Sequence, residues 1–379
     1  MHFIMCTRPL YIAEESNGRK SQHAYPRTDK EFASHPAFTD LKQLRREGTF
    51  VPCRHCRDCL INQADGKRIR ALHEAEYHEH NLFITFTYDS DHLPVDLSLY
   101  YPHMQLLWKK LRNDGHKIRY NGIGEYGGIG YRPHYHYIVH GLELTDLEYQ
   151  FSNDSGDECY SSQYLNAAWG RGIVNVGQLT PRSAMYVADH NKKQAAQIKE
   201  YLPPEQVEVI DKKTGEITLK NKRRFMIPDF TTGGVKLVEP PFFTCSTKPG
   251  IGEKWFREYW RDCFPSDSVI FNGKEHKVPE YYFKLLKRID RETYEQVKAA
   301  RDAVIKSEAF QKEQTPQRLD TKHRYKELIF GGTGERSKPV NRRIGKGRYH
   351  PENIARREAV KHFDPNRDAK MMQLVRMGK

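Results

Sequence analysis

Residues 117–140 read KIRYNGIGEYGGIGYRPHYHYIVH, two strand-like runs on either side of a cluster of glycines. The runs 117–126 and 134–140 contain many β-branched and aromatic residues, and the Gly-rich stretch 127–130 lies between them. This pattern is typical of two antiparallel strands that are joined by a long turn. The sequence therefore predicts a β-hairpin.

Three side chains on this hairpin can reach one point. Glu125 lies on the first strand, and His134 and His136 lie on the second. Because side chains alternate between the faces of a strand, the two imidazoles share a face, and Glu125 lies across the hairpin. Two imidazole nitrogens and one carboxylate oxygen suit Mg²⁺, Mn²⁺ or Zn²⁺ in hydrolysis or phosphoryl transfer. Since the chain has 18 histidines, the alternative is that these are ordinary half-exposed strand residues.

Other elements are indicated on both sides of the hairpin. Residues 82–88 form a β-branched and aromatic run that predicts a buried strand, and residues 173–176 predict another. Apolar residues at helical spacing predict helices over 60–80, over 104–111, and from residue 183 to about residue 201. This order of elements predicts an α+β domain that is built on one antiparallel sheet.

The flanking regions differ in texture. Residues 1–50 are polar without a sustained period, which indicates a loop-rich arm. A polar stretch at 151–165 follows the hairpin. Residues 207–210 and 217–219 predict a second hairpin, and residues 279–313 predict one long helix.

Composition limits the class of protein. The 379 residues are 37% hydrophobic and 29% charged, which is sufficient for one large domain or two ordinary ones. The mean hydropathy is -0.82, and no apolar run approaches the roughly 20 residues that span a bilayer. The first ten residues lack a long apolar segment, so we expect neither an integral membrane protein nor a secretory signal.

The charge balance favours a polyanionic partner. The chain has 62 Lys and Arg against 49 Asp and Glu, a net charge of +13. Residues 336–379 hold 13 basic and 4 acidic side chains, which is +9 of that excess. We therefore expect a basic tail that binds DNA, although a solvated, disordered segment is the alternative.

A polar stripe follows on the helix that is expected after Ser183. Tyr186, His190 and Lys193 recur at i, i+4 and i+7, so they share one helical face. A tyrosine has an ordinary pKa near 10 and needs help to act as a nucleophile. A nearby ammonium favours the phenolate or neutralises charge that develops on a phosphate. The stripe therefore predicts attack on phosphate by Tyr186, supported by Lys193.

Three of the seven cysteines lie close together in the sequence. The spacing of Cys53, Cys56 and Cys59 suits a metal better than disulfides and fits a reducing cytoplasm. Cys6 could add a fourth thiolate to complete a tetrahedral structural zinc site, and His55 is the alternative fourth ligand. The other interpretation is three reduced cysteines at the start of a helix.

Short motifs in a fixed order run through nearly the whole chain. They are PCRHCRDC (52–59), HEA (73–75), FITFTYD (83–89), LP (93–94), GEYG (124–127), RPHYH (132–136), YVA (186–188), PGIG (249–252) and TPQRL (315–319). In these motifs the chain resembles the HUH-superfamily replication initiators of small single-stranded DNA phages, of the Microviridae type found in gokushoviruses. The resemblance implies an α+β HUH endonuclease fold, a central antiparallel sheet flanked by helices. It also implies a cysteine-bearing N-terminal arm and a helical, basic C-terminal region.

The resemblance further implies rolling-circle chemistry. A divalent ion, Mg²⁺ or Mn²⁺, held by Glu125, His134 and His136 would serve a tyrosine that nicks the origin strand, keeps its 5′ phosphate and later religates it. Tyr186 and Lys193 match the family pattern.

His190 stands where the family has a second tyrosine. Three interpretations stay open: an enzyme with one tyrosine, a histidine that acts as acid or base, or a degraded site. We expect the first, with His190 as a proton shuttle because an imidazole titrates near neutral pH.

Five regions are expected. They are an N-terminal arm with the cysteine cluster and a helix (1–80), the HUH core (81–202), a family-specific hairpin and loop region (203–282), a helical region (283–335) and the basic tail (336–379). The expected partners are single-stranded and origin DNA together with the host helicase and DNA polymerase, in the cytoplasm of an infected bacterium. The chain has no phosphate-binding loop of the NTPase type, so a helicase motor would be a host protein.

Basic side chains expected to contact DNA lie on the hairpin and in the tail. They are Arg132, Arg342, Arg343, Lys346 and Arg348. Three rival functions stay open: a catalytically impaired origin-binding protein, a structural zinc protein that acts through partner contacts, and a plasmid initiator or transfer relaxase of the same superfamily.

Removal of residues 336–379 should weaken binding to DNA of any sequence and flatten its salt dependence. Each phosphate contact on duplex DNA contributes a slope of about -0.9 to the log-log salt plot. Binding titrations of the full and shortened chains at several salt concentrations measure this, and an unchanged slope would show that the tail does not touch DNA.

Overall fold

The structure is a computed structural model. It describes residues 6, 9–14, 20–24, 49–54, 56–128, 130–153, 156–189, 205–210, 217–222, 224–229, 234–264, 266–271, 273–313, 318–319 and 321–322. Two compact units divide the chain, Met1–His323 and Arg324–Lys379, and every described residue belongs to the first. The predicted tail therefore lies outside the described residues. Within the described residues, no helix is long and apolar enough to cross a membrane.

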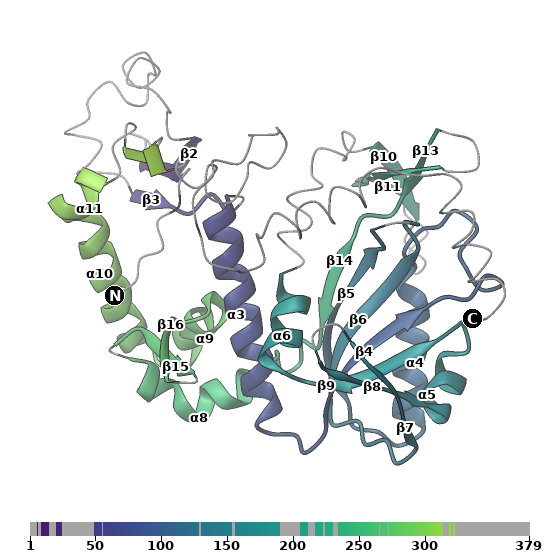
Figure 1. Ribbon diagram of the computed structural model, residues 1–379. Coiled ribbons are helices and arrows are strands. Elements are labelled where there is room, and N and C mark those ends of the chain that lie inside the picture. Colours follow the sequence, from purple (N-terminus) through teal and green to yellow (C-terminus); the bar gives the residue numbers. More distant parts are fainter. Residues whose placement is uncertain are drawn as a thin grey trace, which may run out of the picture. The chain divides into compact units, whose positions relative to one another are not determined.

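A seven-stranded antiparallel sheet forms the centre of the first unit (Figure 1). Its spatial order is β14-β5-β6-β4-β9-β8-β7. The strands are β4 (Asn81–Thr87), β5 (Arg119–Tyr126), β6 (Pro133–His140), β7 (Leu147–Ser152), β8 (Glu158–Ser162), β9 (Val174–Gln178) and β14 (Phe242–Cys245). The structure thus confirms the predicted α+β class, the hairpin of β5 and β6, and the strands near residues 82–88 and 173–176.

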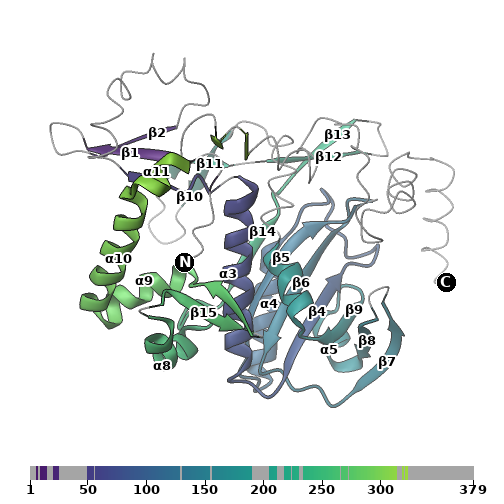
Figure 2. The same ribbon diagram turned by 60° about the vertical axis from the view of Figure 1, so that its left-hand side comes forward.

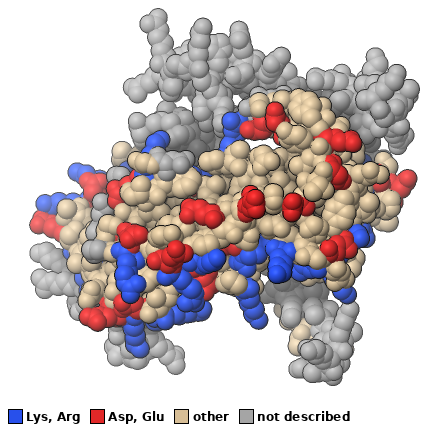
Figure 3. All heavy atoms as spheres, turned by 90° about the horizontal axis from the view of Figure 1, so that it is seen from below, with Lys and Arg blue, Asp and Glu red and all other residues tan. Residues whose placement is uncertain are grey.

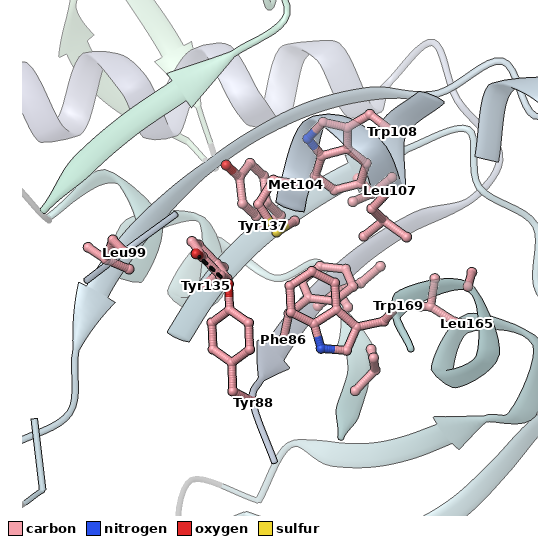
Figure 4. Packing of buried hydrophobic residues seen from close by; sticks show 14 of the residues in the cluster. Phe86, Tyr88, Leu99, Met104, Leu107, Trp108, Tyr135, Tyr137, Leu165 and Trp169 are labelled. Atoms are coloured by element: carbon pink, nitrogen blue, oxygen red, sulfur yellow. Dashed lines mark hydrogen bonds between the residues drawn. The ribbon is translucent and has the colours of Figure 1, made fainter. Parts of the chain in front are cut away.

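One face of the sheet packs against α4 (Tyr101–Asn113) and α5 (Gln163–Trp169). Met104 and Trp108 of α4 are fully buried there with Tyr135 and Tyr137 of β6, because those strand residues point to this face. The hydroxyls of Tyr88 and Tyr135 are 2.9 Å apart, so each has a hydrogen-bonding partner inside the core (Figure 4). This aromatic layer is the main core of the unit.

The opposite face is covered by α3 (Arg57–Ala75) and α6 (Pro181–Ala188) (Figure 2). Ala71 of α3 and Ala184 and Val187 of α6 pack on Ile123 and Ile138 of the sheet. Small side chains at Ala71 and Ala184 allow both helices to approach the strands closely.

The other side of α3 supports a second core. Ile69 is fully buried against Phe256 and Tyr282 in a helical cluster. This region contains α8 (Glu253–Cys263), β15 (Ser268–Phe271), β16 (Lys274–Lys277), α9 (Glu280–Ile289), α10 (Arg291–Lys306) and α11 (Glu308–Glu313). Helix α3 therefore contributes to the cores on both of its sides.

Three smaller sheets complete the described elements. β1 (Leu10–Glu14) pairs with β2 (Lys20–Ala24) and β3 (Thr49–Val51), so the expected loop-rich arm contains a sheet. β10 (Glu205–Ile210) pairs with β11 (Ile217–Lys222), which confirms the second hairpin. β12 (Phe225–Pro228) pairs with β13 (Val235–Val238).

Two of the helix predictions need comment. The single helix predicted over 279–313 is wrong, because the chain leaves helical conformation at Asp290 and Ser307. The Asp290 side chain accepts a hydrogen bond from the backbone N–H of Thr293 and starts α10, which explains the break. For the helix predicted to reach residue 201, the structure describes α6 as far as Ala188, and residues 190–200 lie outside the described part.

Gly122→Ala should destabilise the protein. A Cβ at Gly122 would overlap the Tyr137 ring and the carbonyl oxygen of His136, and overpacking of this kind typically costs about 1–3 kcal/mol. Thermal unfolding should show a lower Tm. Gly128→Ala is the matched control in the same hairpin, since no atom lies within 4 Å of its Cβ. Equal melting temperatures for the two variants would contradict this packing.

Candidate active site

The register of β5 and β6 brings the predicted ligands together. Glu125 pairs directly with His134, and Ile123 pairs with His136. Because residues two apart share a face, Glu125 and both imidazoles lie on the side of the sheet that α3 and α6 cover. The middle residue, Tyr135, points to the other face and is fully buried.

One carboxylate oxygen is the centre of this group. Oε1 of Glu125 lies 3.4 Å from Nε2 of His134 and 3.6 Å from Nε2 of His136. Ligand atoms of the three residues all lie within 4.8 Å of one another. Glu125 is 7% exposed and His136 is 9% exposed, so the group is largely shielded from water.

The outer nitrogens of both imidazoles are already engaged. Nδ1 of His134 donates to the carbonyl oxygen of Arg132 at 3.1 Å, and Nδ1 of His136 lies 2.9 Å from Oγ1 of Thr85. A carbonyl can only accept, so neutral His134 carries its proton on Nδ1, and its Nε2 lone pair faces Glu125. Metal-binding histidines are typically held by such a contact through the second nitrogen. Two Nε2 atoms and one carboxylate therefore fit a divalent cation in chemistry and orientation.

Helix α6 brings a tyrosine to the same oxygen. Thr180 and Ser183 form a capping box at the start of α6, with Pro181 in the first turn, so the helix begins at a defined residue. Ala184 and Val187 anchor its inner face. The Tyr186 hydroxyl donates a 2.7 Å hydrogen bond to Oε1 of Glu125.

Aromatic contacts fix the orientation of the Tyr186 ring. Its centroid lies 4.9 Å from that of His136 in an edge-on arrangement, and its hydroxyl oxygen is 3.4 Å from Nε2 of that histidine. Phe83 stacks on His136 and meets Tyr186 edge-on. Tyr186 is still 38% exposed, so a ligand can reach its ring.

The pKa of Tyr186 is raised above its ordinary value of 10. The causes are burial of the hydroxyl, the negative charge of Glu125 and the hydrogen bond that the phenol donates to it. The phenol is therefore neutral at neutral pH in this arrangement. A cation beside Glu125 would act in the opposite direction.

The remaining predicted site residues are placed as follows. Arg132 is half-buried near the hairpin tip, where its guanidinium donates to the carbonyl oxygen of Tyr88 at 2.9 Å. His190 and Lys193 lie outside the described residues, and so do the four basic residues predicted in the tail: Arg342, Arg343, Lys346 and Arg348. The Sγ atoms of Cys6, Cys53, Cys56 and Cys59 lie within 4.8 Å of one another, while His55 lies outside the described residues.

Thr85 and Phe83 were not identified from the sequence as parts of the site. Both lie on β4, which pairs with β6 so that Thr85 is opposite His136. The alternation in the run 82–88 was a usable signal. Its odd positions hold two threonines among apolar residues, which indicates a face that differs from the core face.

Charge on the described surface is mixed. Figure 3 shows one face of the molecule, where Lys and Arg side chains lie beside Asp and Glu side chains. Among the described residues, Arg301 pairs with Asp267 at 2.5 Å and Arg68 with Asp65 at 2.6 Å. The described surface on this face is therefore not a field of one sign.

Known proteins share this sequence pattern. The family model for the replication-associated protein of the ORF2 type matches residues 81–195. The chain is 27% identical over 241 residues to the replication-associated protein VP4 of Bdellovibrio phage phiMH2K, which covers 61% of this chain and 65% of that protein. It is 27% identical over 328 residues to the replication-associated protein ORF2 of Spiroplasma virus 4, with coverages of 82% and 89%.

A third relative is the replication-associated protein ORF4 of Chlamydia phage 1, with 26% identity over 262 residues, 67% of this chain and 57% of that protein. The chain thus spans less than two thirds of the Bdellovibrio and Chlamydia phage proteins. No solved structure matches significantly. The family model and the phage relatives confirm the resemblance: the chain belongs to the Microviridae type of phage replication-associated proteins.

Proposed function

We propose that this replication initiator is a metal-dependent endonuclease that nicks the origin strand through Tyr186 and starts rolling-circle replication. One observation carries the proposal: the Tyr186 hydroxyl and the Nε2 atoms of His134 and His136 converge on one oxygen of Glu125. A phenol and a set of metal ligands around one point can act on a single phosphate. We assign the sheet to the HUH class on the same grounds.

The reaction exchanges one phosphate ester for another. Tyr186 loses its proton, its oxygen bonds to phosphorus, and the bond from phosphorus to the 3′ oxygen breaks. That oxygen takes up a proton and leaves as a 3′ hydroxyl, while Tyr186 keeps the 5′ phosphate. The ester retains the bond energy for religation, so no nucleotide cofactor is required.

Each described residue has a part in this step. Oε1 of Glu125 accepts the phenol's hydrogen bond and is placed to receive its proton. Thr85 and the carbonyl of Arg132 hold the imidazoles with Nε2 inward. A divalent cation, Mg²⁺ or Mn²⁺, on these ligands would polarise the scissile phosphate and offset the negative charge that raises the pKa of Tyr186.

Two further residues belong to the proposal on sequence grounds. Lys193 would stabilise charge on the phosphate, and His190 would move a proton to or from the reacting oxygens. With a histidine at this position, one tyrosine does both the nicking and the religation. Arg132 and the basic tail would hold DNA through its phosphates.

The partners follow from the reaction. The released 3′ hydroxyl is a primer end for the host DNA polymerase, and separation of the strands needs the host helicase. The substrate is single-stranded or origin DNA in the cytoplasm of the infected bacterium.

Tyr186→Phe should abolish the protein-linked nicked product, because only the attacking oxygen is removed. The assay incubates the protein and Mn²⁺ with supercoiled DNA that carries its own origin, and separates linked from free DNA on a denaturing gel. Tyr259→Phe is the matched control, since Tyr259 is 37% exposed against 38% for Tyr186 and lies on α8. Linked product from Tyr186→Phe at the normal level would contradict the proposal.

The same assay separates the impaired origin-binding alternative. His190→Tyr should retain cleavage, and His190→Ala should slow it without abolishing it, because the nucleophile is intact in both. A native protein that binds origin DNA but leaves it uncut, with cleavage restored in His190→Tyr, would establish the impaired protein instead.

His136→Ala should abolish nicking and leave most DNA binding, because phosphate contacts elsewhere supply that affinity. Nicking and filter binding are measured on the same preparation. His80→Ala is the control, as its side chain is 43% exposed and lies 4.0 Å from its nearest carboxylate partner, Glu143. Full nicking by His136→Ala would remove His136 from the site.

A further inference from the structure

Four thiols gather at the start of α3 and share no residue with the candidate active site. The Sγ atoms of Cys6, Cys53, Cys56 and Cys59 all lie within 4.8 Å of one another. Those of Cys6 and Cys56 are 3.6 Å apart, well beyond the roughly 2.05 Å of a disulfide. Cys6, Cys53 and Cys59 are buried and Cys56 is half-buried. Four polar sulfurs in so small a space need a partner that binds all of them.

The chain path holds the sulfurs in place. Cys53 follows β3, and Arg54 has a φ of 65°, a left-handed conformation that turns the backbone sharply. Cys56 is the N-cap residue of α3, and Cys59 lies in its first turn. Cys6 comes from the segment before β1, 47 residues away from Cys53.

Backbone groups point toward these sulfurs. The N–H of Cys53 donates to Sγ of Cys6 at 3.3 Å, and the N–H of Cys56 donates to Sγ of Cys53 at 3.2 Å. Such bonds stabilise a thiolate more than a thiol. The N-cap Cys56 makes no side-chain capping hydrogen bond, and the positive end of the helix dipole favours negative sulfur there. The surroundings thus favour thiolates, whose mutual repulsion requires a cation among them.

We propose that Cys6, Cys53, Cys56 and Cys59 bind one zinc ion in a closed structural site. A tetrahedral ion with Zn–S bonds of about 2.3 Å places its sulfurs roughly 3.8 Å apart, which agrees with the 3.6 Å pair and the 4.8 Å limit. Four thiolates are the soft donor set that selects zinc, and they leave no position open for a substrate. The fourth ligand is Cys6, and His55 is not needed.

The ion ties the N-terminal segment to the helix that both cores share. Cys6 lies just before β1, and β1 pairs with β3, which ends next to Cys53. Cys59 begins the helix whose later residues Ile69 and Ala71 pack into the helical cluster and against the sheet. Arg54, in the turn between the ligands, pairs with Glu280 of α9 at 3.2 Å. Zinc therefore fixes the first turn of α3 and the three-stranded sheet beside it.

Metal analysis of the full chain, purified under reducing conditions without chelator, tests the site. We expect one zinc per chain, retained after dialysis against a weak chelator. Cys56→Ser should lose zinc to that chelator, and its Tm should fall. Cys159→Ser is the matched control, because it removes a half-buried thiol outside the cluster and should keep the metal.

A second measurement on the native chain covers failure of the variant to fold. Replacement of the ion by Co²⁺ should give the visible absorption of a tetrahedral cobalt–thiolate centre, and a strong chelator should lower the Tm. A native chain with no metal, with iron in place of zinc, or with disulfides among these cysteines would overturn the proposal. Both measurements are independent of nicking activity, so they stand whatever becomes of the proposed function.

Discussion

The direct pairing of Glu125 with His134 across β5 and β6 is the constraint on which the candidate site depends. A shift of the register by one residue would turn the imidazoles toward the opposite face of the sheet. The buried rings of Tyr135 and Tyr137 hold the register from that face, where they pack against α4. Stability and chemistry are therefore coupled: the aromatic core on one face fixes the ligands on the other.

Helix α3 extends this coupling to the rest of the described unit. On one side Ala71 packs with α6, the helix that carries Tyr186, and on the other side Ile69 packs into the helical cluster. A proposed zinc ion at its first turn would hold the same helix at its start. The position of Tyr186 therefore depends on packing that spans two cores as well as on its hydrogen bond to Glu125.

Local patterns in the sequence predicted what nearby residues determine. The hairpin and the shared face of His134 and His136 follow from alternation within 24 residues. Pairing between distant segments was not predictable in this way. Strand β14 joins the sheet beside β5 from more than 100 residues later in the chain, and the polar stretch after the hairpin contains β7 and β8. The contact of Thr85 with His136 depends on the β4–β6 register, which a single sequence does not specify.

Identification of the residue that becomes linked to DNA tests the central claim most directly. After native protein has reacted with single-stranded DNA of its own origin, nuclease and protease digestion leaves a peptide that bears a nucleotide, and mass spectrometry locates it. We predict the modification on Tyr186, because its hydroxyl lies 2.7 Å from the carboxylate at the centre of the ligand group. A nucleotide on His190, or on a tyrosine outside α6 such as Tyr201, would contradict this assignment.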